Sequence, residues 1–239
     1  MSNLPATLEE AIVQAQEATQ AALAAGLTRL QVELAFPELK PMPVARQFLT
    51  IFENLGPNLK VLFSDAGAGA LARRDWGEMP CVIRGLGELK AEVQPDDRLF
   101  LIIAPSSVEV AAVEKLCETV GERPVVLLNP RLEDVATVGI GYAGRQLRTR
   151  FLSTIESCYY LRPLEQAALF RCYPGLWQVW REENGSYQQV AEMPQRPSGE
   201  ELDRLLLGSS EVTPDAPSPS PSRENFFTGL QRFLRALGR

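Results

Sequence analysis

Two acidic residues, Glu33 and Asp65, are the first candidates for catalysis or ligand binding in this chain. Each lies at or just after the end of a predicted strand, and ligands of open α/β sheets bind beyond the carboxyl ends of the strands. Two carboxylates that converge there could act as general acid and base, or hold a divalent cation. The sequence shows no third ligand, so it favours a plainer interpretation, in which both cap helix N-termini and neighbouring backbone amides.

The segment after Asp65 offers a weak phosphate-binding motif. Gly67, Gly69 and Ala72 satisfy a G-x-G-x-x-A spacing where a predicted strand gives way to a helix, and backbone N–H groups at such a point can cradle an anion. Asp65 would repel a phosphate, and no G-x-x-x-x-G-K-[ST] string occurs in the chain. A tight turn that requires glycine is the favoured alternative. The candidate ligand-binding residues at this edge are Glu33, Asp65, Gly67, Gly69, Ser106 and Asn129.

Composition narrows the chemistry further. The chain has no histidine, which removes the usual general base near neutral pH and the Ser-His-Asp and Cys-His arrangements. Its four cysteines form no C-x-x-C pair, so we expect reduced structural thiols, no metal site and no cofactor. A net charge of −6 argues against a nucleic-acid binder. We identify no catalytic residues and favour a protein that is not an enzyme.

Two further clusters are candidates for partner binding. Arg145, Arg148 and Arg150 are concentrated in one loop-to-helix stretch and could grip a phosphate or an acidic partner, although pairing with local glutamates is the favoured alternative. Tyr160 and Trp177 belong to an aromatic-rich region. Such a region forms either a packed antiparallel core, which is favoured, or an exposed recognition face.

The last 32 residues carry the clearest functional signal. A tract rich in proline and serine at 208–222 is predicted to be an extended linker, and residues 223–239 are predicted to form an amphipathic helix with a local charge of +3. Such a helix suits an anionic membrane surface or a partner's groove; the alternative is that it folds back onto its own domain. The residues that would make this contact are Phe226, Phe227, Leu230, Phe233, Leu234, Leu237, Arg232 and Arg235.

The secondary-structure elements predicted to position these residues indicate an α/β fold. A capping box at Thr7 and Glu10 starts a helix that ends near Gly26. Strands are predicted at 30–36, 60–63, 81–83, 98–104 and 124–128, and a second helix at 44–55. Apolar strands that alternate with helices imply a mostly parallel, Rossmann-like sheet with helices on its faces.

The pattern changes to an antiparallel extension at about 151–193. Extended runs at 151–161, 169–173, 177–181 and 187–193 are joined by turn signals, the strongest of which is Asn184-Gly185. A final helix is predicted at 199–207. We therefore expect one α/β domain over 1–207, a linker over 208–222 and the terminal helix over 223–239.

The N-terminus shows neither a secretory signal nor a transit peptide, and no stretch of about 18 apolar residues occurs. These features predict a cytoplasmic protein. Any membrane contact is expected to be peripheral.

Several strings resemble a known family of uncharacterised α/β domains from cyanobacteria and plastids, whose plant members include the "low photosystem II accumulation" assembly factors. The strings are L-P-x-x-L-E-E-A near the start, V-E-L-A-F-P at 32–37, L-F-S-D-A-G-A-G-A-L-A-R-R at 62–74, V-V-L-L-N-P-R-L-E-D at 125–134, Y-Y-L-R-P-L at 159–164 and L-F-R-C-Y-P-G-L-W-Q-V at 169–179. The resemblance covers about residues 4–207 and leaves out the tail. It supplies no active site.

The resemblance implies a role in photosystem II biogenesis through protein contacts at the thylakoid surface. The leading hypothesis is therefore a non-enzymatic accessory factor that binds a photosystem or assembly-factor subunit, located peripherally on the cytoplasmic face of the thylakoid membrane. One alternative is an enzyme or sensor that binds a nucleotide or another phosphorylated small molecule at the carboxyl edge of the sheet. Another alternative is a soluble scaffold whose terminal helix binds a protein partner and does not bind lipid.

Overall fold

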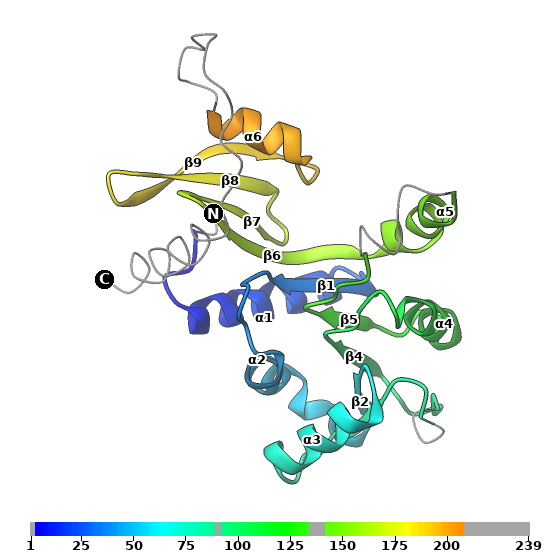
Figure 1. Cartoon of the computed structure of the whole chain (residues 1–239). Coiled ribbons are helices and arrows are strands. Elements are labelled where there is room, and N and C mark those ends of the chain that lie inside the picture. Colours follow the sequence, from blue (N-terminus) through cyan, green and yellow to red (C-terminus); the bar gives the residue numbers. More distant parts are fainter. Residues whose placement is uncertain (1–2, 89–91, 134–141, 208–239) are drawn as a thin grey trace.

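The computed structural model describes residues 3–88, 92–133 and 142–207. Its strands form a nine-stranded sheet in the order β3-β2-β4-β5-β1-β6-β7-β8-β9 (Figure 1). The six strands from β3 to β6 in that order are parallel, and β6 to β9 continue the same sheet as an antiparallel meander. The α/β class and the antiparallel C-terminal extension predicted from the sequence are therefore confirmed.

The parallel strands are short and mostly buried on both faces, as the near-continuous apolar runs predict. They are β1 (Arg29–Leu34), β2 (Leu59–Phe63), β3 (Val82–Gly85), β4 (Leu99–Ile103) and β5 (Val125–Leu128). The antiparallel part contains β6 (Glu156–Leu164), β7 (Ala167–Cys172), β8 (Trp177–Glu183) and β9 (Ser186–Met193). Asn184 and Gly185, both with positive φ (53° and 80°), form the β8–β9 turn, as the Asn-Gly signal predicts.

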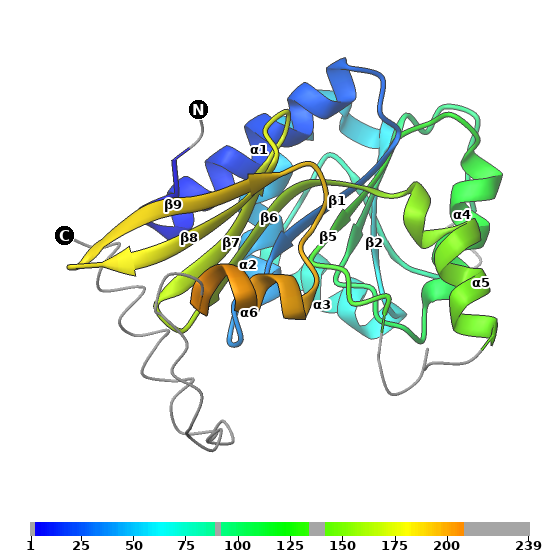
Figure 2. The ribbon, with the colours of Figure 1, turned by 90° about the horizontal axis from the view of Figure 1, so that it is seen from above.

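Helices cover both faces of the sheet. They are α1 (Leu8–Ala24), α2 (Pro41–Phe48), α3 (Ala66–Trp76), α4 (Val110–Val120), α5 (Tyr142–Arg150) and α6 (Gly199–Leu207), with 3-10 helices η1 (Leu49–Asn58) and η3 (Leu152–Thr154). Residues of α1, α2 and α3 share one hydrophobic core, α4 and α5 pack into a second, and α6 covers the antiparallel strands in a third. Figure 2 shows α1 and α6 on opposite sides of the strands.

Two predicted elements differ from the structure. The helix predicted at 44–55 is two helices, α2 and η1. In a 3-10 helix residues i and i+3 are eclipsed, which lets Leu49 and Phe52 bury their side chains together on one side. The extended run predicted from Phe151 becomes a strand only at Glu156, because Phe151 and Leu152 turn into the α4–α5 core instead.

The aromatic-rich region is a packed core. Tyr160 and Trp177 are only 2% and 4% exposed, and they lie with Leu202 of α6 in the core above the antiparallel strands. Neither ring is available as the exposed contact face proposed above, because α6 and its preceding connection cover them. Tyr159 and Phe170 pack edge to face on the opposite side of the sheet, with ring centroids 5.8 Å apart.

Candidate functional site

The carboxyl ends of β5 and β1 form a switch point of the sheet. The chain leaves β5 toward α5 on one face and leaves β1 toward α2 on the other face, and in open α/β sheets ligands bind where neighbouring connections diverge in this way. The Asn129 side chain joins the two strands, because its Oδ1 accepts a hydrogen bond from the Leu34 amide at 2.7 Å. Asn129 has φ of +50°, a conformation that asparagine tolerates better than most residues.

Glu33 lies beside this junction, on the face that carries α4, α5 and α6. Leu30, Val32 and Leu34 of the same strand turn into the α1 core, so the alternation of a strand puts Glu33 on the other face. Its Oε2 accepts a hydrogen bond from Gln31 Nε2 at 3.2 Å. Burial raises the pKa of Glu33 from 4.5 to about 7; nearby Arg196 opposes this shift and Glu133 adds to it.

Arg196 lies in the connection between β9 and α6, close enough to Glu33 for its charge to affect the Glu33 pKa. Its guanidinium lies 4.4 Å from the centroid of the Tyr160 ring and 5.6 Å from that of Trp177, and its Nη2 donates a hydrogen bond to the Tyr160 hydroxyl at 2.6 Å. Figure 2 shows this connection passing back over the sheet before α6 begins. Tyr160 is the register neighbour of Glu33 on β6, which explains how residues so far apart in sequence meet.

Arg162 completes the cluster. It is exposed, follows Tyr160 by two residues on the same strand, and therefore points to the same face. Burial raises the pKa of Tyr160, whereas the nearby Arg196 and Arg162 both act to lower it. We call Glu33, Tyr160, Arg162 and Arg196 the β1-edge cluster. Chemically, it combines two guanidinium groups with a carboxyl group that titrates near neutral pH.

Asp65 and the glycines after it have structural roles. Asp65 is the N-cap of α3, and its Oδ1 accepts a hydrogen bond from the Ala68 amide at 2.9 Å. That bond lowers the pKa of Asp65. Gly67 and Gly69 lie within α3 rather than in a turn. A Cβ on Gly69 would lie 3.1 Å from the Arg84 backbone, so this glycine lets α3 approach β3 closely.

Ser106 pairs with Glu109 in the turn before α4, which itself begins at Val110 with Glu109 as its N-cap. Its hydroxyl donates to Glu109 Oε2 at 2.6 Å, and its amide donates to the same oxygen at 2.8 Å. The hydroxyl in turn accepts a hydrogen bond from the Val108 amide at 3.2 Å. The polar atoms of Ser106 are thus used within the turn that leads into α4.

Glu33 and Asp65 do not converge. They belong to β1 and to the end of β2, with β4 and β5 between them, and three inter-strand spacings separate these ends by about 14 Å. Across the described residues, no group of three or more Asp, Glu, Cys or His side chains is arranged to hold a metal ion. A shared carboxylate site is therefore not supported by this geometry.

The arginines of α5 are largely paired with glutamates. Arg148 forms an ion pair with Glu133 at 3.0 Å, and Arg150 forms one with Glu114 at 2.7 Å. These bonds raise the pKa of both arginines. Arg145 makes no ion pair with any residue that the structure describes. A surface hollow of about 510 Å³ is lined by Arg145, Gln146, Thr149 and Arg150.

A family model matches residues 5–204, which is most of the chain and spans α1 to the first turns of α6. The chain belongs to the DUF1995 family. The description of this family is "Domain of unknown function", so it assigns no activity to the β1-edge cluster. No solved structure matches the chain.

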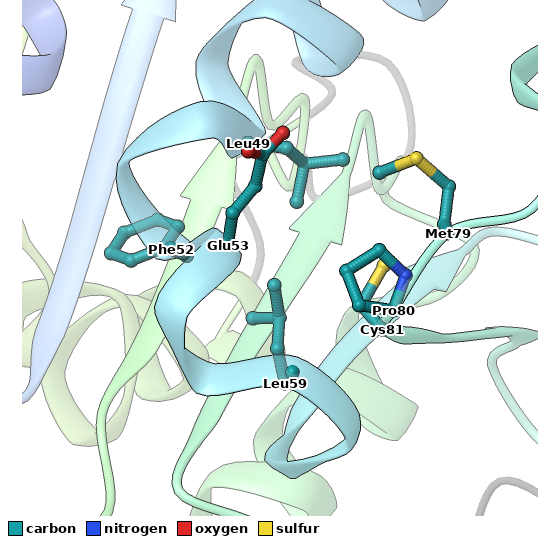
Figure 3. A pocket seen from close by; sticks show the side chains of 8 residues that line it. Leu49, Phe52, Glu53, Leu59, Met79, Pro80 and Cys81 are labelled. Carbon is teal, nitrogen blue, oxygen red and sulfur yellow. The ribbon is translucent and has the colours of Figure 1, made fainter.

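An apolar pocket of the DUF1995 domain lies between η1 and the segment before β3. Figure 3 shows Leu49, Phe52 and Leu59 facing Met79 and Cys81 across it. The empty volume is about 190 Å³ and is too tight to admit a water molecule. Burial raises the pKa of the Cys81 thiol, and raises that of Cys117 to about 11 and of Cys158 to about 12. The cysteines form no disulfide, and thiols whose pKa is raised in this way are unreactive.

The predicted contact residues of the terminal helix, from Phe226 to Leu237, lie outside the described residues of this DUF1995 protein. In the described part of the chain, no helix has the length and apolar character needed to cross a bilayer. Sequence reasoning missed Arg162 and Arg196. Arg196 stands between two prolines in a connection without a motif, and no local signal places it beside β1.

Proposed function

We propose that this protein is a non-enzymatic accessory factor of the photosynthetic apparatus that binds a photosystem or assembly-factor subunit at the thylakoid surface. The photosynthetic assignment is supported by the resemblance of six strings of the domain to the plant assembly factors. The α/β domain supplies the protein contact in this proposal. The terminal segment brings the domain to the membrane surface.

The observation that carries the proposal is the position of the amphipathic segment. The family match ends at residue 204 and α6 ends at Leu207, whereas the apolar and basic residues of the segment lie at 223–239. The segment is therefore an addition to the family domain, and its composition suits a surface outside that domain.

The energies fit a weak, reversible attachment. Burial of three Phe and three Leu side chains to half depth would supply about 5 kcal/mol before ordering losses. Three net positive charges would add up to about 1 kcal/mol each at an anionic surface. These magnitudes suit a peripheral protein that exchanges with the bulk phase.

The alternative function, nucleotide binding at the segment from Asp65 to Gly69, has less support. Asp65 occupies the N-terminus of α3, where a phosphate would have to bind, and the Ser106 hydroxyl is used by Glu109. Gly69 serves close packing against β3. The proposed function therefore does not use the Asp65-to-Gly69 segment.

The test is an affinity capture from photosynthetic membranes with the full chain and with a chain that ends at Gly208. We expect both forms to capture the same photosystem or assembly subunits, and the shorter form to do so only from detergent-solubilised membranes. Capture that disappears with the tail in both preparations would make the terminal segment the recognition element. No photosynthetic subunit in any arm would overturn the proposal.

A further inference from the structure

The guanidinium of Arg196 is held in place, yet the residues that the structure describes use little of its hydrogen-bonding capacity. Stacking on Tyr160 and Trp177 and the bond to the Tyr160 hydroxyl determine its position. A guanidinium has five N–H donors, of which this bond uses one. Arg196 is nevertheless exposed to solvent. An ordered and accessible guanidinium loses little entropy when it binds an anion bidentately.

A second cation, Arg162, lies on the same face of β6 as this phenol, two residues further along the strand. The positive charge of Arg162 acts to lower the pKa of the Tyr160 hydroxyl, as that of Arg196 does, so both guanidinium groups lie near this hydroxyl. Within the described ranges, neither arginine has a carboxylate within 4.0 Å. Arg148, Arg150, Arg171 and Arg181 differ in this respect, because each has a glutamate partner.

The acidic group next to these two arginines is Glu33, whose carboxyl group can be neutral at neutral pH. Glu33 is half-buried and faces Arg196 from the β9–α6 connection, Glu133 from the β5–α5 connection and Tyr160 from β6. Glu133 is itself paired with Arg148. With a pKa of about 7, Glu33 is partly protonated at neutral pH, and a protonated carboxyl donates a hydrogen bond instead of repelling an anion.

We propose that the β1-edge cluster is a binding site for the oxyanion group, a carboxylate or a phosphate, of a small ligand. Arg196 and Arg162 bind the anion, Tyr160 positions Arg196, and Glu33 lies at the rim of the site. The position agrees with the general rule for open α/β sheets, because the cluster lies on β1 and β6, next to the β5–β1 switch point. The proposed site uses only residues of the α/β domain, and it does not rest on the proposed photosynthetic partner.

The experiment is an NMR titration of the full chain that follows the arginine Nε–Hε signals. Inorganic phosphate and malonate are added separately at constant ionic strength, with chloride as the reference salt. We expect a saturable shift of the Arg196 signal with at least one of the two anions, and the preferred anion identifies the phosphate or carboxylate class. No saturable shift with either anion up to about 20 mM, a range that covers the weakest specific sites, would overturn the proposal.

Matched variants distinguish a specific binding site from non-specific attraction of the anion to positive charge. Arg196→Gln and Arg162→Gln should each weaken binding about tenfold or more, because each removes a charge-assisted contact. Arg204→Gln removes an exposed arginine from α6 and should leave the affinity unchanged. Equal binding by wild type and Arg196→Gln, or an equal loss in Arg204→Gln, would show that no specific site exists. The backbone amide spectrum of each variant reports whether the fold is intact, and the two single variants provide independent tests.

The role of Glu33 is tested with sulfate, whose charge does not change over the range studied. Between about pH 6 and about pH 8, the wild type should lose about fivefold in affinity as Glu33 ionises. Glu33→Gln should remove this pH dependence and keep the tighter binding. An unchanged pH dependence in Glu33→Gln would exclude Glu33 from the site.

Discussion

At the scale of single residues, this protein assigns different roles to side chains that look alike in the sequence. Asp65 and Glu33 are both carboxylates at the carboxyl edge of the sheet. Asp65 caps α3, and the bond it accepts from the Ala68 amide lowers its pKa. Glu33 lacks a helix to cap, and burial raises its pKa to about 7. The difference comes from the backbone amides available to each carboxylate, which the residue type alone does not specify.

The raised pKa of Glu33 predicts how stability depends on pH. The native state binds a proton that the unfolded state has released between pH 4.5 and about 7, so Glu33 makes stability fall as pH rises through this window. Glu33→Gln should therefore be more stable than wild type at about pH 8, by about 1 kcal/mol, because solvent screens a partly exposed carboxylate.

The measurement is urea denaturation of wild type and Glu33→Gln at a series of pH values. At about pH 4, below the window, the two curves should nearly coincide, because Glu33 is protonated in both states. A variant that is less stable than wild type at about pH 8 would contradict the assignment of an unfavourable buried charge.

At the scale of elements, the contact of α3 with β3 depends on glycine at two positions. A Cβ on Gly69 would come close to the Arg84 backbone, and a Cβ on Gly85 would lie 2.5 Å from Ala66 N and Asp65 C. The first turn of α3, with its Asp65 cap, therefore lies directly over the end of β3. The motif that resembles a phosphate cradle in the sequence is in the structure a close helix–strand packing.

Gly85→Ala should destabilise the protein by about 1–3 kcal/mol, because the atoms that its Cβ meets are backbone and cannot rotate away. Gly199→Ala at the start of α6 is the matched control, since its Cβ would meet nothing within 4 Å. Surface substitutions of that kind stay within about 0.5 kcal/mol. Thermal or urea unfolding of both variants is the check, and equal stabilities would show that α3 can move away at no cost.

At the scale of the whole molecule, a closed domain is followed by a segment of opposite charge. The chain carries a net charge of −6, whereas residues 223–239 carry +3. Under the proposed function, the domain and this segment bind different surfaces. A protein partner contacts the domain, and anionic lipid attracts the segment.

Phe233→Glu should abolish binding of the full chain to anionic liposomes, because it removes an apolar anchor and adds a negative charge to the positively charged segment. Thr228→Glu introduces the same charge on the polar face of the predicted helix and should weaken binding by less. Flotation at low and high salt is the measurement. Binding that survives Phe233→Glu would contradict a membrane anchor and favour a protein groove or a contact with the domain itself.

Local interactions made much of the fold predictable from the sequence. The Thr7 cap of α1, the Asn184-Gly185 turn and the helix at Gly199–Leu207 occur as predicted, because each depends on residues within a few positions of one another. The alternation of buried strands with helices likewise predicted the parallel sheet. The family match over 5–204 is also a property of the sequence.

The candidate site was only half predictable. Glu33 was a candidate because it lies near the end of a strand, but its predicted partner Asp65 is three strands away and its actual neighbours were not predicted. Strand order and the β1–β6 register place Tyr160 beside Glu33, and the connection from β9 returns over the sheet to bring Arg196 to both. The sequence determines which segments become strands, because backbone preference and apolar periodicity are local. Only the tertiary structure decides which strands become neighbours, because that choice depends on burying all helix and sheet faces at once.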